Sequence, residues 1–301
     1  MSAPPYPRPE QYGPPGRWQS PGPVPLRPMT VGEILGLGWG VVRRSFGPLV
    51  GAAVAVAALS AAVTIGALAV SGSLQTYADG AWAEDLLRGR TASIPSGLVV
   101  STLLGLVVST SGGPVIAGMA AAFAGAQALG GDGRGAVTER LKGRWPVLLG
   151  TAVTVGVLVA GGLLILVVPG ILAYLILAFA GPAVVMERGS VAGALRRSAT
   201  LTRGHRGRIL GAAATTLIAG SLAGAIVSSL AGAVLGGTGS VTALLVTQAV
   251  AVLVTGLTGA WTGAVLALLY IDIRIRTERL DQALWAAAQR ARLSPPDLPA
   301  G

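Results

Sequence analysis

The sequence has no cysteine, a single histidine and few charged side chains. Without cysteine the chain can form no disulfide, thiolate metal site or cysteine nucleophile. Charged residues make up 11% of its 301 residues, against about 25% in soluble proteins, which is too few to cover a water-facing surface. The lone His205 lies between Arg203 and Arg206 and has no partner with which to build a metal site.

Sequence signatures of catalysis and of cofactor binding are missing as well. There is no glycine-rich phosphate loop followed by Lys-Ser or Lys-Thr, and no pair of carboxylates at a spacing that suggests acid–base catalysis. Ionisable residues are absent from the middle of the apolar runs, where transporters and intramembrane enzymes usually carry them. We therefore predict a protein with no catalytic activity, no cofactor and no metal.

Long uncharged runs dominate what is present. A helix of about 20 apolar residues can cross the roughly 30 Å hydrocarbon core of a bilayer. The sequence has six such runs, at about 47–70, 97–130, 145–168, 170–186, 209–236 and 241–271. They predict an all-α, polytopic transmembrane bundle of six spans.

Two of these runs contain helix-breaking residues. Run 97–130 holds Pro114 after several Ser, Thr and Gly residues, so it is either one kinked helix, which we favour, or a re-entrant piece followed by a span. Runs 145–168 and 170–186 are joined by Pro169 and Gly170, which predict the end of one helix and a tight hairpin into the next.

The basic residues are sorted between alternate connections. The two ends and the loops 131–144 and 187–208 hold 20 of the 22 Lys and Arg, whereas loop 71–96 holds two. This asymmetry predicts a multi-pass protein of a bacterial cytoplasmic (inner) membrane with both termini in the cytoplasm. Topology also explains the net charge of +10, so we expect no nucleic-acid partner.

The domain organisation follows from these runs. Ten of the first 28 residues are proline, so residues 1–29 are predicted to be a disordered, Pro-rich cytoplasmic tail. Residues 30–286 form the six-span membrane domain, and 287–301 a cytoplasmic C-terminal tail. Three amphipathic helices, near 30–46, 134–144 and 190–203, are expected in the membrane interface before a pair of spans each; Thr30 and Glu33 form a capping box in the first.

Arginines on these segments are candidate contacts for anionic lipid or a partner protein, although the helices could instead simply pack under the bundle as connectors. The candidate contact residues are Arg43, Arg44, Arg196, Arg197, Arg203, Arg206 and Arg208. An ion-paired latch between the ends of the fourth and sixth spans is a further hypothesis. It comprises Glu187, Asp272, Arg274 and Arg276, with Arg188 and Arg196 nearby.

Small residues recur every four positions in the last two runs. Such residues let helices approach closely in lipid, where hydrophobicity gives little drive to associate. They predict a tight crossing of the fifth and sixth spans, or else self-association into a homo-oligomer. The packing residues expected there are Gly220, Gly224, Ser228, Gly232, Gly259 and Gly263.

Three stretches carry a resemblance to a known family: LRPMTVGEILGLGWGVVRRSFGPLVG, PAVVMERGSVAGALRRSATLTRGHRGRILG and YIDIRIRTERLDQAL. Over about residues 26–285 the chain resembles actinobacterial polytopic membrane proteins that are similar to the membrane domain of some glycerophosphodiester phosphodiesterases. The third motif supplies Tyr270, Asp272, Arg274, Arg276, Glu278 and Asp281. These motifs imply an architecture and no active site. The phosphodiesterase barrel needs about 250 residues, so hydrolysis is not expected here.

Three functions are compatible with the sequence. We expect a non-catalytic accessory or scaffold that contacts membrane lipids or a protein partner through its arginine-rich cytoplasmic face. The alternatives are a small permease or lipid-handling transporter, and a regulatory membrane domain acting in trans on a hydrolase. A polar cavity at mid-depth among the second, fifth and sixth spans would favour the transporter, and a bundle closed by glycine contacts would favour the accessory.

Overall fold

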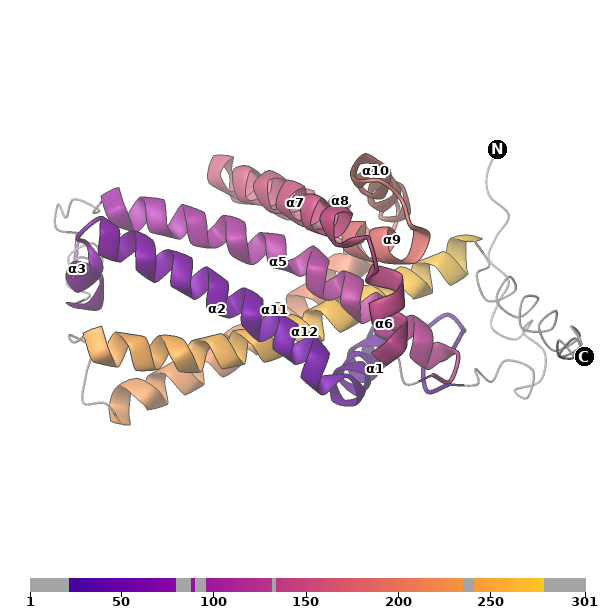
Figure 1. Ribbon diagram of the computed structural model, residues 1–301, viewed down its shortest axis with the longest axis horizontal. Coiled ribbons are helices and arrows are strands. Elements are labelled where there is room, and N and C mark those ends of the chain that lie inside the picture. The colour runs from indigo at the N-terminus through magenta and orange to yellow at the C-terminus, as the bar shows by residue number, and fades with distance from the viewer. Residues whose placement is uncertain (1–21, 80–87, 90–95, 132–133, 235–240, 279–301) are drawn as a thin grey trace, which may run out of the picture.

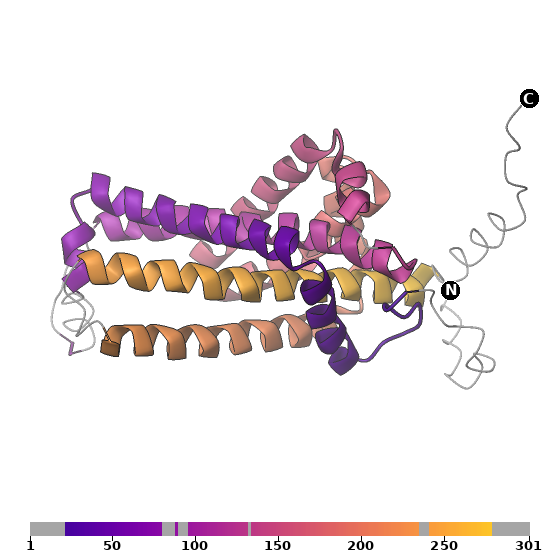
Figure 2. The same cartoon turned by 60° about the horizontal axis from the view of Figure 1, so that its bottom comes forward.

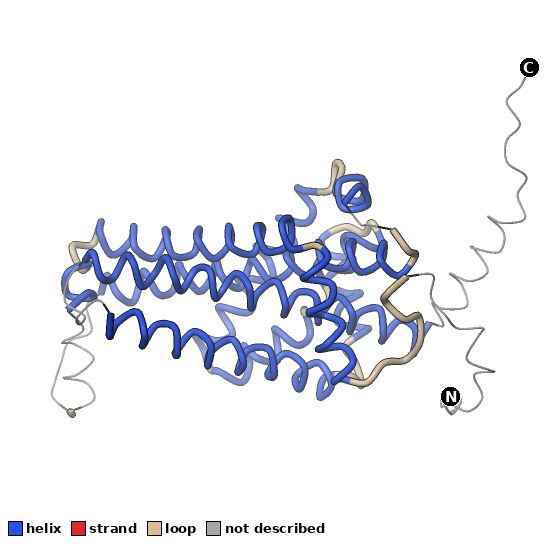
Figure 3. The backbone as a smooth tube through the Cα atoms, turned by 90° about the horizontal axis from the view of Figure 1, so that it is seen from below, coloured by secondary structure: helices blue, strands red, loops and turns tan. Residues whose placement is uncertain are grey.

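A computed structural model describes residues 22–79, 88–89, 96–131, 134–234 and 241–278, which are helical with short connections and contain no strand (Figures 1 and 3). Six helices are long and apolar enough to span a membrane, which confirms the predicted all-α architecture. They are α2 (Phe46–Val70), α5 (Ser96–Ala128), α7 (Trp145–Ile165), α8 (Val167–Leu177) continued by α9 (Ala180–Glu187), α11 (Arg206–Val234) and α12 (Val241–Glu278).

Short helices lie at both ends of the bundle. At one end, on the right of Figure 1, lie α1 (Val31–Arg44), α6 (Arg134–Leu141) and α10 (Val191–Leu201), together with the C-terminal part of α12. At the opposite end lies α3 (Leu74–Asp79). We call these the basic end and the α3 end, because the basic connections lie at the first.

The amphipathic helix α1 turns its apolar stripe toward protein. Its predicted capping box is present, with Glu33 N–H donating to Thr30 Oγ1 at 3.2 Å. Ile34 and Val42 are fully buried, and Trp261 Nε1 of α12 donates to Leu35 O at 3.0 Å. The buried residues of the stripe therefore pack against the bundle, and α12 is the main neighbour of α1.

Helix α12 is the centre of the bundle, with α1, α2, α5 and α11 packed around it. Small residues let its neighbours approach closely. A Cβ added at Gly256 would lie 2.8 Å from Val54 Cα of α2, and one at Gly263 would lie 2.7 Å from Ile116 Cγ2 of α5. Backbones meet at distances that only glycine permits.

Helices α11 and α12 pack against each other, and among the described glycines of α11 it is Gly220 that makes a close contact with α12. A Cβ at Gly220 would lie 2.9 Å from Thr258 Cγ2, whereas one at Gly224 would meet nothing within 4 Å. Gly259 and Gly263 face α2 and α5 rather than α11, and Ser228 is only half-buried. Four-residue spacing does not identify which neighbour a glycine faces, because α12 has neighbours on several sides. The side-chain environment of Gly232 lies outside the described part.

Run 97–130 forms the single helix α5, with Pro114 inside it, in agreement with the favoured alternative. The hairpin after α7 differs from the prediction. The chain breaks at Leu166, whose backbone is extended (φ −161°, ψ 151°), and Pro169 and Gly170 lie in the first turn of α8. Proline suits a first helical turn because its missing N–H would have no intrahelical partner there. It therefore marks the start of the second helix and not the turn.

Candidate functional site

Two charge clusters tie the helix ends together at the basic end. In the first, which we call the Glu187 cluster, Tyr270 Oη donates to Glu187 Oε1 at 2.6 Å, and Arg197 Nε donates to both Glu187 oxygens at 2.9 and 2.8 Å. Arg197 also pairs with Glu278, whose other oxygen accepts from Arg274 Nε at 2.8 Å. This cluster joins α9, α10 and α12.

The second cluster is built on Asp272, whose side chain is fully buried. Its Oδ1 accepts from Met29 N–H at 2.7 Å. Its Oδ2 accepts from Arg276 Nε at 2.9 Å and lies 3.1 Å from Arg208 Nη2. Both arginines also donate to Met29 O. This Asp272 cluster ties α11, α12 and the segment before α1, and its buried charge is neutralised and hydrogen-bonded, as burial requires.

The predicted latch residues are thus divided between two places. Glu187 and Arg274 lie in the first cluster, Asp272 and Arg276 in the second, and Arg188 and Arg196 in neither. Arg197 and Arg208, expected to contact lipid, are cluster members. Sequence reasoning named Tyr270 and Glu278 only as motif residues, not as partners of Glu187 and Arg197, and it missed Met29. A signal for the first two was present, because Tyr270, Arg274 and Glu278 recur at four-residue spacing on one helix face.

The remaining candidate arginines are exposed at the same end. Within the described residues their guanidinium groups make no hydrogen bond or ion pair. They are Arg43, Arg44, Arg196, Arg203 and Arg206. Two of them, Arg43 and Arg44, line a pocket of about 390 Å³ together with Phe46 and Pro48.

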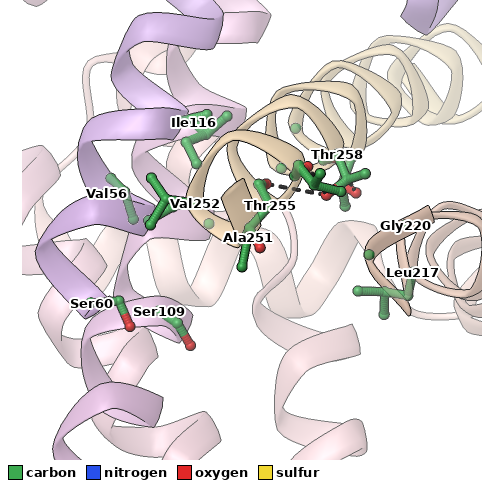
Figure 4. A pocket seen from close by; sticks show the side chains of 18 of the residues that line it. Val56, Ser60, Ser109, Ile116, Leu217, Gly220, Ala251, Val252, Thr255 and Thr258 are labelled. Atoms are coloured by element: carbon green, nitrogen blue, oxygen red, sulfur yellow. Dashed lines mark hydrogen bonds between the residues drawn. The ribbon is translucent and has the colours of Figure 1, made fainter. Parts of the chain in front are cut away.

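A larger cavity of about 580 Å³ lies away from these charges, among the long apolar helices. Figure 4 shows α2 and α5 on one side, α12 in the middle and α11 on the other. The residues labelled there are Val56 and Ser60 of α2, Ser109 and Ile116 of α5, Leu217 and Gly220 of α11, and Ala251, Val252, Thr255 and Thr258 of α12. No charged side chain lines the cavity.

Most hydroxyls in the cavity wall are already used by the helices. Thr64, Thr258 and Thr262, for example, each donate to the backbone carbonyl four residues earlier, at 2.9 Å. The side chains of Ser221, Gln248 and Thr255 make no hydrogen bond within the described part. The cavity therefore combines an apolar wall with a few free hydrogen-bonding groups on α11 and α12. Among the described residues, no three His, Asp or Glu side chains are grouped so as to hold a metal ion.

Comparison with known proteins identifies a family for the chain but assigns it no function. No curated protein and no solved structure matches the chain, and nothing found links it to glycerophosphodiester phosphodiesterases. A family model described as "Domain of unknown function (DUF7847)" matches residues 34–273, a range that includes the cavity and reaches from α1 into the Asp272 cluster. The chain therefore belongs to the DUF7847 family, which is described as a domain of unknown function.

Proposed function

We propose that this protein is a non-catalytic, lipid-handling integral membrane protein that takes the chain of a membrane lipid into the cavity among α2, α5, α11 and α12. The observation that carries the proposal is the cavity itself. Its wall is mainly apolar, unlike the polar path that would have indicated a permease, and this favours a lipid chain as the ligand. The volume of the cavity is in the range of small-molecule sites, about 300–1,000 Å³.

The chemistry of the wall suits a hydrocarbon chain with an uncharged polar group. Aliphatic side chains such as Val56, Ile116 and Leu217 offer no partner to a charged ligand, and an unpaired charge in such a place is strongly unfavourable. The free side chains of Gln248 and Thr255 can hydrogen-bond to an ester or a hydroxyl. A neutral part of a lipid meets both conditions.

Photo-crosslinking tests this proposal. The purified protein is reconstituted with a phospholipid that carries a diazirine in its acyl chain, and the labelled residues are mapped by mass spectrometry. We expect labels on the cavity-facing residues of α11 and α12. Gly113→Phe and Gly224→Phe place a ring in the cavity without a backbone clash, since a Cβ at either glycine meets nothing within 4 Å. Both should reduce cavity labelling about tenfold, corresponding to about 1.4 kcal/mol of binding.

Gly66→Phe is the matched control, because Gly66 also has an unobstructed Cβ position but does not line the cavity. It should label like the wild type. Equal labelling of all three variants, or labels spread evenly over the outer faces of the bundle, would contradict lipid binding in the cavity.

A second candidate is an accessory or scaffold that uses the basic end, and the unpaired arginines favour it. Arg43 and Arg44 share a pocket with Phe46 and Pro48, so two cations stand beside apolar surface, which suits an anionic lipid headgroup. Each contributes on the order of 1 kcal/mol near an anionic surface. Nanodiscs of mixed anionic and zwitterionic lipid should show anionic lipid enriched around the wild type and not around Arg43→Gln/Arg44→Gln.

The remaining hypotheses concern orientation and partners. The charge asymmetry supports a bacterial cytoplasmic membrane with the basic end in the cytoplasm. The resemblance to phosphodiesterase membrane domains suggests regulation of a separate hydrolase. The exposed apolar side chains of α11, among them Leu222, Ile226 and Leu230, suggest a homo-oligomer or a protein partner. Crosslinking in native membranes followed by affinity purification tests for a hydrolase, a second copy of the chain or another protein partner.

A further inference from the structure

The turn between α7 and α8 is apolar on every side. Five consecutive residues, Leu164 to Val168, expose between 63% and 76% of their surface. No polar side chain occurs between Gly161 and Ala173. Burying one such side chain is worth about 1.5–3 kcal/mol, so a turn of this composition is strongly unfavourable in water.

Packing against α5 limits how far this hairpin reaches. The middle of α7 touches α5 where Thr110 Oγ1 donates to Gly156 O at 3.2 Å, and a Cβ at Gly156 would overlap Ser111. From Gly156, α7 continues for nine residues to Ile165, or about 14 Å at most. From Ser111, α5 continues for 15 residues to Ser96, or about 22 Å. The end of α7 at Ile165 therefore stops roughly 9 Å short of the end of α5, and Leu166 extends the tip by one further residue.

The returning helices also place the tip short of the end of α5, by about 6 Å. A Cβ at Gly181 of α9 would overlap Pro114 O, so these two residues lie at one level. Val167 is 14 residues before Gly181, about 21 Å of helix, whereas Ser96 is 18 residues before Pro114, about 27 Å. Figures 1 and 2 show the α7–α8 hairpin ending well before the α3 end of the bundle.

The backbone at the turn suits an environment without water. Leu166 N–H donates to Gly162 O of α7 at 3.0 Å, and Leu166 O accepts from Gly170 N–H of α8 at 3.4 Å. Both backbone groups of this extended residue are therefore hydrogen-bonded, one to each helix. Pro169 has no N–H to leave unpaired. In hydrocarbon each unsatisfied backbone group costs several kcal/mol, which favours a turn as short as this one.

We propose that α7 and α8 form a re-entrant hairpin whose tip, Leu164–Val168, lies among lipid acyl chains in the half of the bilayer nearer the α3 end. Four helices, α2, α5, α11 and α12, then cross the membrane. The basic loops before α7 and after α9 remain on one side, so the charge asymmetry is unchanged. The proposal rests on the length and composition of the hairpin and is independent of lipid binding in the cavity.

The absence of cysteine makes a direct test available. Leu166→Cys is compared with Thr76→Cys in α3 and Thr138→Cys in α6, both exposed. Each variant is treated with a membrane-impermeant maleimide in intact cells and in inverted vesicles. We expect each control to be labelled from one side only, the two from opposite sides, and Leu166→Cys from neither until the protein is denatured in SDS. Labelling of Leu166→Cys from the same side as Thr76→Cys would overturn the proposal.

Depth-dependent quenching separates burial in lipid from burial in protein. A bimane probe is attached to Leu166→Cys after purification, and the protein is reconstituted with lipids that carry doxyl groups in the headgroup or deep in the chain. The proposal requires the deep quencher to be the stronger. Stronger quenching from the headgroup, or no quenching by either lipid, would contradict it.

Discussion

Asp272 is the residue on which the basic end depends most. Its carboxylate is fully buried and accepts hydrogen bonds from Met29 N–H and from Arg276, with Arg208 beside it. Such a group is tolerated in a core because every partner is in place. The same partners hold the segment before α1 against α12, so one side chain couples the start of the domain to its central helix.

Removal of this carboxylate leaves two arginines without their counter-charge. Breaking a buried pair in this way costs about 3–5 kcal/mol. We therefore expect Asp272→Ala to lower the thermal unfolding temperature of the detergent-solubilised protein markedly. Glu139→Ala is the control, because Glu139 is exposed and makes no ion pair within the described residues. Equal unfolding temperatures for the two variants would show that the Asp272 cluster is not structural.

A second residue-scale prediction concerns pH. The Arg27 guanidinium, and next the Thr30 backbone N–H, lower the pKa of Glu33 from its ordinary 4.5 to about 2. Because the folded-state pKa is depressed, the ionised form stabilises the cap of α1 above pH 4.5, and this contribution is lost as the pH falls toward 2. The difference in unfolding temperature between wild type and Glu33→Gln should be constant near neutral pH and shrink below 4.5. A difference that grows on acidification would contradict this assignment.

At the scale of elements, α12 is the helix around which the others are arranged. Its glycines touch α2 and α5, and Gly256 lies directly against the Val54 backbone. Gly256→Leu should therefore push α2 and α12 apart and cost about 1–3 kcal/mol through overpacking. Gly161→Leu in α7, where an added Cβ meets nothing within 4 Å, should leave the unfolding temperature nearly unchanged. Comparable losses in both would mean that helix propensity, and not the α2–α12 contact, decides the outcome.

Features that depend on residues close together in the chain were predictable from the sequence. Features that depend on which helices pack together in space were not. The apolar runs and the Thr30–Glu33 cap concern residues close in the chain, and the structure contains both. The partner of Gly263 is chosen by the three-dimensional arrangement of helices, which no spacing along one helix reveals. For the same reason the residues of the predicted latch lie in two separate clusters. The sequence could not predict whether a cavity exists among the helices. Its walls come from helices far apart in the sequence.

At the scale of the whole molecule, the charges are arranged at one end of an apolar bundle. The Glu187 and Asp272 clusters and the exposed arginines all lie at the basic end, whereas the cavity wall carries no charge. The account of function depends on this arrangement matching a bilayer, with the uncharged helices in hydrocarbon and the basic end in the cytoplasm. In this orientation the cavity lies among helices inside the hydrocarbon core, where membrane lipid is the most abundant molecule available to bind.

The orientation of the full-length chain is the most direct test. Alkaline phosphatase, which is active only outside the cytoplasm, is inserted in frame at Gly89, Gly143 or Gly204, three turns with positive φ. We predict activity for the Gly89 insertion and none for the other two, with all three proteins recovered only from detergent-extracted membranes. Activity at Gly89 and Gly204 alike, or recovery of the wild-type chain in the soluble fraction without detergent, would contradict the account.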